Sequence, residues 1–561
     1  MSLILGMDTG GTYTDGVLFD KENRKIIAKT KALTTKEDFC ICIGNCLNAL
    51  PEEKLAEVGL VCLSTTMATN AVVEGKGCRT FLILMGKMPH GKLPAADVRM
   101  VKGALDIQGK VLSDVDMNEI DKVLEELPSD VESIVISGYA SVRNPDHEIR
   151  IREHILRKTD LPVVCAHELS GALGFYERTV TAVLNGQLVP ILKRLIWDTK
   201  EMLKERGISA PVMIVKGDGT FISAEMARTR PIDTLLSGPA ASVTGAMFLS
   251  GADNAVFMDM GGTTTDIACL DNGKVKVSAD GACIAGWRTR VRAIDMYTTG
   301  LGGDSLITLD EAGNVKIGPE KVTPLCLAAV NMEEFKGTDS GFTPTDLAHV
   351  KGIYTKWDSS ASAEWISQQA ARFCLTEKEM CERLEKSFIS GVYNALMESG
   401  QYADGDIIIG IGAPAKAWMP RVAECTGLDI RVPEHAEVAN AVGAAAGNIE
   451  ESAEITIRRD TVTGKYIGYL PCKRMEFDSL DDARKICIEE GRQWLEEQTV
   501  KCGCCTPDII EEVEDLYCDR YRSEEKVYVE TKMRLIAVGA PAFAEYGSKG
   551  SNEKSSDNIK G

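Results

Sequence analysis

The chain has 561 residues, of which 44% are hydrophobic and 26% are charged, as is usual for a globular enzyme. This length suggests about three or four compact units rather than one core. The net charge of −20 argues against a nucleic-acid partner and against an anionic membrane surface. There is no apolar run of the ~18 residues that a membrane helix needs and no basic leader, so we expect a cytoplasmic protein with no membrane partner.

The first predicted element is a strand at residues 2–7, which runs into the motif Asp8-Thr9-Gly10-Gly11-Thr12-Tyr13-Thr14-Asp15 and then into a second strand. Adjacent glycines lack a Cβ atom, so their backbone N–H groups can converge on an anion. Threonine hydroxyls add donors, and the leading Asp8 can hold a metal-bound water. Taken alone, such a turn is more often only a tight β-turn.

Alternating strands and helices follow the first motif. Helices are predicted near residues 36–50, 67–74 and 148–156, and strands at residues 59–63, 79–85, 133–137 and 162–165. This alternation predicts a mostly parallel sheet with helices on its faces, and therefore an α/β fold. We expect residues 1–175 to form the first subdomain.

A long helix is predicted from residue 174 to residue 203, and a second copy of the motif follows downstream. It reads Asp259-Met260-Gly261-Gly262-Thr263-Thr264-Thr265-Asp266 and again lies between two apolar runs. Two near-identical copies indicate duplicated subdomains that face each other across a cleft, each contributing one loop to the phosphates of a nucleotide.

The second subdomain is expected to span residues 176–450. A buried strand at residues 406–411 ends in a Gly-rich turn that contains Gly410 and Gly412. A helix of small residues at 437–445 is suited to close packing against the other subdomain, which would allow the cleft to hinge.

Residues 451–545 are predicted to form a small α+β appendage. Its predicted strands lie at residues 454–459, 465–470, 526–530 and 533–538, with a charged helix near residues 480–497. Residues 546–561 are rich in Gly, Ser, Lys and Asn, and we expect a disordered tail.

The 18 cysteines are expected to be reduced thiols, many of them buried as small hydrophobic groups. One cluster, Cys502-Gly503-Cys504-Cys505 with Cys518 downstream, contains a Cys-x-x-Cys pair. A structural zinc site usually separates two such pairs by a loop, so we predict that this cluster holds no zinc.

The paired motifs resemble the phosphate 1 and phosphate 2 loops of the actin, sugar kinase and Hsp70 ATPase superfamily. Four further segments resemble the hydantoinase A and 5-oxoprolinase family and occur in the family's order: residues 63–71, 176–185, 235–240 and 300–305. The resemblance covers about residues 1–450. It implies two duplicated ribonuclease H-like, actin-like ATPase subdomains around a nucleotide cleft, followed by the C-terminal appendage.

The resemblance also implies ATP and Mg²⁺ as cofactors. Asp8 and Asp259 are the expected magnesium ligands, acting through water, because magnesium dehydrates reluctantly. Asp15 and Asp266 are equally compatible with turn capping and with a nucleotide role. The expected nucleotide-binding residues are Thr9, Gly10, Gly11, Thr12, Gly261, Gly262, Thr263 and Thr264, with Gly410 and Gly412 near the adenosine.

A cleft of this kind must also position an acceptor. Asp304 and Arg178 join Asp8 and Asp259 as the expected catalytic residues, and the expected substrate-binding residues are Thr65, Thr66 and Asn70. Two of these side chains have structural alternatives. Asp304 could cap a following helix, and Arg178 could pair with Glu177 or Glu168.

Three functions stay open at this point. The first is ATP-dependent opening of a cyclic amide, lactam or hydantoin by phosphorylation of its carbonyl. The second is a subunit of an acetone or acetophenone type carboxylase, and the third is an ATP-switched activator. The resemblance further implies a hydantoinase B-like partner subunit, and a homo-oligomer is also open.

Overall fold

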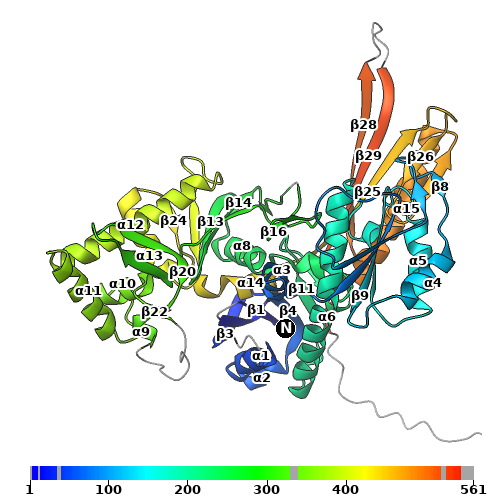
Figure 1. Ribbon diagram of the computed structural model, residues 1–561. Helices are drawn as coiled ribbons and strands as arrows, with labels where there is room; N and C mark the ends of the chain where they lie inside the picture. Colours follow the sequence, from blue (N-terminus) through cyan, green and yellow to red (C-terminus); the bar gives the residue numbers. More distant parts are fainter. Residues whose placement is uncertain are drawn as a thin grey trace, which may run out of the picture.

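The computed structural model describes residues 3–10, 13–34, 39–278, 280–328, 339–519 and 526–544. It has an α/β architecture in which helices cover several separate sheets (Figure 1). The expected tail at residues 546–561 lies outside the described residues, as do Gly11 and Thr12 of the first motif.

The first motif lies in a six-stranded sheet, which we call the N-terminal sheet. Its strands follow the order β12-β11-β4-β1-β2-β3; β1, β2 and β3 are antiparallel neighbours, whereas β1, β4 and β11 are parallel. The strands are β1 (Leu3–Thr9), β2 (Tyr13–Asp20), β3 (Lys25–Leu33), β4 (Val58–Thr65), β11 (Val212–Val215) and β12 (Phe221–Ser223). Helices α1 (Phe39–Asn48) and α2 (Glu52–Leu55) connect β3 to β4, whereas α3 (Met67–Val73) follows β4 and α7 (Ala224–Ala227) follows β12.

A second sheet is purely parallel and is inserted between β4 and β11. It has the order β10-β9-β5-β6, and we call it the parallel sheet. It comprises β5 (Thr80–Met85), β6 (Asp97–Val101), β9 (Ser133–Gly138) and β10 (Val163–Cys165), with the small pair β7 (Ala104–Leu105) and β8 (Val111–Ser113) nearby. Its helices are α4 (Met117–Glu125), α5 (Asp146–Leu156) and α6 (Phe175–Glu205).

The second motif lies in a sheet with the order β15-β14-β13-β23-β24, in which β18 also pairs with β14. Here too an antiparallel hairpin is followed by parallel neighbours. The strands are β13 (Ala255–Met260), β14 (Thr265–Asp271), β15 (Lys274–Val275), β18 (Met296–Thr299), β23 (Ile408–Ile411) and β24 (Ile430–Arg431). In both hairpin units the first strand of the hairpin pairs antiparallel with the second and parallel with a strand from further along the chain.

Several short elements and a helical layer follow the second hairpin; in Figure 1 the layer forms the left side of the molecule. The helices are α9 (Leu325–Ala328), α10 (Pro344–Val350), α11 (Ser360–Arg372), α12 (Glu377–Glu398) and α13 (Ala415–Thr426). The small strands are β16 (Cys283–Ile284), β17 (Trp287–Arg288), β19 (Ser305–Leu309), β20 (Val315–Lys321), β21 (Thr323–Pro324) and β22 (Ser340–Gly341).

Helices α8 (Ser237–Ser250) and α14 (Ala439–Ala446) cross in the middle of the molecule (Figure 1). Their backbones come unusually close at two glycines. A Cβ atom at Gly245 would overlap the carbonyl oxygen of Ala439, and one at Gly443 would overlap that of Ala241. The small residues of this segment therefore allow the two helices to pack almost backbone to backbone.

The appendage is a five-stranded antiparallel sheet with the order β27-β26-β25-β29-β28, covered by α15 (Leu480–Lys501). Its strands are β25 (Ile449–Arg459), β26 (Tyr466–Tyr469), β27 (Arg474–Phe477), β28 (Asp508–Asp519) and β29 (Lys526–Gly539). Sequence analysis missed β27 and β28 and divided β29 in two. Strands β28 and β29 form a hairpin that projects from the molecule, where acidic edge residues obscure the pattern of a half-buried strand (Figure 1).

The expected domain limits at residues 175 and 450 remain a proposal. The sheet pairing adds two facts: β11 and β12 lie beyond residue 175 yet belong to the N-terminal sheet, and β25 begins at Ile449. The cysteine cluster starts just after α15. Cys502 and Cys504 are buried, whereas Cys505 and Cys518 are exposed.

Candidate functional site

The first motif forms a tight hairpin between β1 and β2. Asp8 lies opposite Asp15 in the strand register, and the backbone N–H of Gly10 donates to the carbonyl oxygen of Tyr13 over 3.1 Å. Both aspartates are only 4% exposed. The described part of the loop therefore directs two buried carboxyl groups to the end of the hairpin.

The second motif is built in the same way between β13 and β14. Asp259 lies opposite Asp266, and the N–H of Gly261 donates to the carbonyl oxygen of Thr264 over 2.8 Å. Gly262 and Thr263, which follow Gly261, are partly exposed at the tip of this loop. The expected equivalence of the two motifs is thus present in their backbone hydrogen bonds.

The two hairpins bring four carboxyl groups, which we call the carboxylate cluster, into electrostatic contact. Burial raises the pKa of Asp8 to about 6, and the charges of Asp15 and Asp259 act in the same direction. Burial also raises the pKa of Asp259, with a further contribution from Asp15. The pKa of Asp266 is raised to about 7 by burial and then by Asp259. Charges on both loops therefore act on one another.

Two polar side chains that sequence analysis did not single out hold this cluster in place. Asn440 on α14 donates from Nδ2 to Oδ2 of Asp8 over 2.8 Å and to Oδ2 of Asp15 over 3.0 Å. Lys31 on β3 places Nζ 2.6 Å from Oδ1 of Asp15. The one available signal was that Asn440 is a lone polar residue in a run of small apolar residues.

The carboxylate cluster fits a divalent cation. Oδ1 of Asp8 and Oδ1 of Asp266 are buried and have no hydrogen-bond donor among the described residues. Gly238 at the start of α8 leaves room beside the first of these oxygens, since a Cβ atom there would lie 3.8 Å from it. Mg²⁺ prefers carboxylate oxygens and keeps several of its waters, so Asp8 and Asp259, whose charges act on one another, could hold it through water.

The expected substrate-binding residues lie next to the first loop. Because β1 and β4 are parallel, Thr9 and Thr65 are register partners at the ends of their strands. Thr66 donates from Oγ1 to the carbonyl oxygen of Thr9 over 3.2 Å, and Asn70 donates from Nδ2 to Oγ1 of Thr66 over 3.4 Å. Thr65 is buried and Asn70 is exposed, so the three side chains differ in depth beside the first hairpin.

Asp304 lies against the second loop. Its backbone N–H donates to the carbonyl oxygen of Gly262 over 2.6 Å, and a Cβ atom at Gly262 would overlap its carboxylate. Burial raises the pKa of Asp304. The alternative that Asp304 caps a helix is wrong, because the strand β19 follows it.

The two glycines expected near the adenosine have different surroundings. Gly412 has a positive φ of 93°, and a Cβ atom there would overlap the carbonyl oxygen of Met260 and lie 2.7 Å from Oδ1 of Asp259. Gly410 lies inside β23, where a Cβ atom would be 2.6 Å from Cγ of Met419. Gly412 therefore borders the carboxylate cluster, whereas Gly410 allows α13 to pack on the strand.

Arg178 is not brought together with the carboxylate cluster. It is 1% exposed and donates from Nη2 to the carbonyl oxygen of Gly138, at the end of a strand in the parallel sheet, over 2.9 Å. Its burial lowers the pKa of the guanidinium. The alternative partners have other contacts: Glu177 lies 3.6 Å from Arg290, and Glu168 pairs with Arg152.

The raised pKa of Asp266 predicts a pH-dependent stability. In the unfolded chain this carboxyl ionises near 3.8, whereas in the folded protein it keeps its proton up to about 7, so its contribution to stability is lost as the pH rises through that window. We expect the variant Asp266→Asn, free of nucleotide and divalent cation, to unfold at a higher temperature than the wild type near pH 8, and the two to converge near pH 4. An equal difference in unfolding temperature at both pH values would contradict this.

No helix in the described ranges is both long enough and apolar enough to cross a membrane.

Two family models match the chain. The hydantoinase/oxoprolinase model matches residues 178–453, and the model of the hydantoinase/oxoprolinase N-terminal region matches residues 4–159.

Curated relatives agree with these matches. The chain is 27% identical to the caprolactamase subunit alpha of Pseudomonas jessenii, over 75% of this chain and 67% of the relative. It is also 27% identical to the acetophenone carboxylase gamma subunit of Aromatoleum aromaticum, over 61% of this chain and 52% of the relative. The matched part thus spans about two thirds of the first relative and about half of the second.

Two solved structures have the same fold. The ATP-dependent caprolactamase from Pseudomonas jessenii aligns with a TM-score of 0.71 at 23% identity, over 96% of this chain and 87% of that chain. A nucleotide-free acetone carboxylase aligns with a TM-score of 0.70 at 19% identity, over 96% of this chain and 88% of that chain. From the two family models, which together cover most of its length, we conclude that this chain belongs to the hydantoinase/oxoprolinase family.

Proposed function

We propose that this protein is an ATP-dependent amidohydrolase that opens a cyclic amide, lactam or hydantoin ring. The observation that carries the proposal is the carboxylate cluster, in which Asp8 and Asp259 come from two hairpins of the same construction. Two Gly-rich turns whose leading aspartates act on one another would suit a chain of phosphates, because glycine-rich backbone can offer N–H donors. The relative named as an ATP-dependent caprolactamase supports the choice of substrate class.

An amide carbonyl resists attack by water, and phosphorylation of its oxygen would activate it. In the proposed reaction the bond between the γ-phosphorus and ADP breaks as a bond forms between that phosphorus and the amide oxygen. One water then adds to the carbon, and the C–N bond breaks to leave an amine and an acyl phosphate. A second water releases phosphate and the carboxylate, so one ATP and two waters are used for each ring.

The residues of the two hairpins would bind different parts of MgATP. Asp8 and Asp259 would hold Mg²⁺ through water, and the bound cation would neutralise the negative charge of the phosphates. The backbone N–H groups and hydroxyls of the two turns would orient the phosphates for in-line transfer. The donors are Thr9, Gly10, Gly11, Thr12, Gly261, Gly262, Thr263 and Thr264, with Gly412 beside them.

The acceptor would enter along Thr65, Thr66 and Asn70. Thr66 bonds to Thr9, which follows Asp8 of the carboxylate cluster, so a carbonyl oxygen held by these side chains would meet the terminal phosphate there. Asp304 lies across the cluster against the second loop, where its raised pKa suits a group that accepts or donates a proton.

A second candidate function is a subunit of an ATP-dependent acetone or acetophenone type carboxylase. It is favoured by the relative named as an acetophenone carboxylase subunit and by the fold shared with acetone carboxylase. The same loops would then activate a carbonyl compound or bicarbonate. The two candidates differ in the acceptor, not in the nucleotide site.

We also propose that the chain works in the cytoplasm with a partner subunit of the hydantoinase B type. Several relatives are named as subunits, among them the caprolactamase subunit alpha, the acetophenone carboxylase gamma subunit and the acetone carboxylase beta subunit. The partner would process the phosphorylated intermediate, so the chain alone should turn over slowly. Complete conversion of substrate by the isolated chain would argue against this requirement.

The experiment that tests the function measures phosphate release by the purified protein with MgATP. Added compounds would be ε-caprolactam, 5-oxoproline, hydantoin, or acetone with bicarbonate. We expect at least one cyclic amide to stimulate phosphate release and to yield a ring-opened product by mass spectrometry. Stimulation by the ketone with bicarbonate alone would favour the carboxylase, and no stimulation by any compound would count against both.

A further inference from the structure

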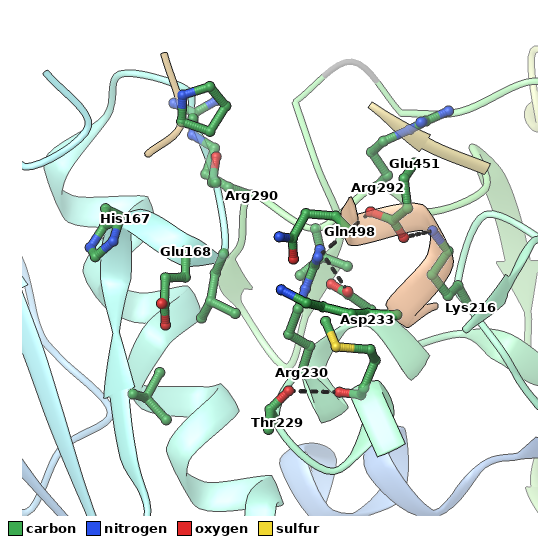
Figure 2. A pocket seen from close by; sticks show the side chains of 18 of the residues that line it. His167, Glu168, Lys216, Thr229, Arg230, Asp233, Arg290, Arg292, Glu451 and Gln498 are labelled. Carbon is green, nitrogen blue, oxygen red and sulfur yellow. Dashed lines mark hydrogen bonds and ion pairs between the residues drawn. The ribbon is translucent and has the colours of Figure 1, made fainter. Parts of the chain in front are cut away.

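A cavity of about 1120 Å³ lies apart from the carboxylate cluster, and none of the residues assigned above to nucleotide or substrate lines it. Its walls include the end of the parallel sheet, the turn after β11, the loop after β17, and the appendage with α15. Figure 2 shows His167 and Glu168 on one side and Lys216 and Glu451 on the other, with Arg230 and Gln498 between them.

The inner wall of this cavity is a network of opposite charges. Nζ of Lys216 lies 2.9 Å from Oε1 of Glu451. Arg230 lies 2.8 Å from Asp233 through Nη2 and 3.6 Å from Glu451 through Nη1. Lys216, Asp233 and Glu451 are each 7% exposed, so the charges are held with little water around them. Such a network is rigid and specific in shape.

The network leaves hydrogen-bond donors unmet. Nε of Arg230 and Nε of Arg290 are buried and have no acceptor among the described residues. Arg290 comes from the loop after β17, and its nearest carboxylate, that of Glu177, is 3.6 Å away. Both arginine side chains line the cavity and are 25% exposed, so the accessible N–H groups of their guanidinium groups can bind the oxygens of a carboxylate, which is the group that guanidinium binds best.

Two further carboxylates that line the cavity, those of Asp218 and Glu450, lie beside Arg292. Asp218 and Glu450 lie 3.8 Å and 2.9 Å from Arg292, and Arg292 is partly exposed. Basic and acidic side chains line the cavity in nearly equal number, although the whole chain carries a net charge of −20. A site with balanced charges gains little from a ligand with a net charge, but it suits a ligand that carries both signs.

We propose that this cavity binds a zwitterionic amino acid. Its carboxylate would accept from Arg230 and Arg290, and its ammonium group would meet Glu450, the more exposed of the two acidic side chains beside Arg292. The ring opening proposed above also yields an amino acid, but the cavity is assigned from its own charges and needs no ATP. Failure of ligand binding and failure of the proposed reaction are therefore separate results.

The test is titration calorimetry on the full chain without nucleotide. The probes are glycine, glutamate and 6-aminohexanoate, with hexanoate and hexylamine as matched compounds that lack one charge and ε-caprolactam as the ring-closed form of 6-aminohexanoate. We expect one amino acid to bind saturably with one site per chain, and its binding to weaken about tenfold or more in Arg290→Gln, because a charged hydrogen bond is lost. If 6-aminohexanoate is the amino acid that binds, it should bind at least about tenfold more tightly than hexanoate, hexylamine or ε-caprolactam.

Two further variants protect the interpretation. Arg230→Gln should weaken amino-acid binding as Arg290→Gln does. If the loss of the buried Arg230 impairs folding, Arg290→Gln alone still tests the proposal. Arg288→Gln is the matched control, because Arg288 lies in the same hairpin region, is largely exposed and does not line the cavity. Absence of saturable binding for all three amino acids, or binding that Arg290→Gln leaves unchanged, would overturn the proposal.

Discussion

Replacing Asp8 or Asp259 by Asn is expected to reduce ATP hydrolysis by about 100-fold or more, the size of effect seen when one preorganised charged or polar group is removed from a reacting phosphate or acyl site. Both side chains lie in the carboxylate cluster, and Oδ1 of Asp8 has no donor among the described residues. The amide keeps the shape of the carboxylate but not its charge, so the cation would lose a ligand while the hairpins stay intact.

Folding and activity can be separated in this experiment. Burial raises the pKa of both aspartates, so removing the charge should not lower the unfolding temperature. Asp271→Asn is the matched control, because Asp271 ends the same hairpin strand as Asp266 but is exposed at its far end. Phosphate release at the wild-type rate by both Asp8→Asn and Asp259→Asn would refute the nucleotide site.

A single methyl group at Gly443 is expected to destabilise the protein by about 3 kcal/mol or more, at the upper end of the usual cost of overpacking. A Cβ atom there would overlap the carbonyl oxygen of Ala241 and lie 2.6 Å from the backbone nitrogen of Gly245. The obstructing atoms are backbone, which cannot move aside as a flexible side chain can. The variant Gly443→Ala should therefore push α8 and α14 apart. The resulting loss of stability can be measured by urea or thermal unfolding.

The same change should also lower activity in the molecules that stay folded, because α14 carries Asn440, which holds Asp8 and Asp15. Gly171→Ala is the control, since a Cβ atom at Gly171 meets no heavy atom within 4 Å. If Gly443→Ala and Gly171→Ala unfold at the same denaturant concentration as the wild type, the close crossing of α8 and α14 is not important for stability.

The local parts of the site followed from the sequence because they depend on short-range chemistry. Apolar runs on both sides of Asp8-Thr9-Gly10 and of Asp259-Met260-Gly261 predicted strand, turn and strand, and the structure has these elements. The α/β class and the family were also predicted correctly. The alternation of strand and helix periodicity and the order of the motifs can both be read from the sequence without any knowledge of contacts. Thr65 and Thr66 do lie beside the first loop, but their role in binding a substrate stays a prediction.

Only the tertiary structure decided which distant residues share a site. Asn440 and Lys31 reach the carboxylate cluster from elements that no local pattern links to Asp8, and Arg178, although it lies in a family-like segment, is buried at the end of the parallel sheet. The charged cavity exists because β11, the parallel sheet and the appendage meet there. Periodicity determines which face of an element is buried, whereas the partner of that face is chosen by packing between segments hundreds of residues apart.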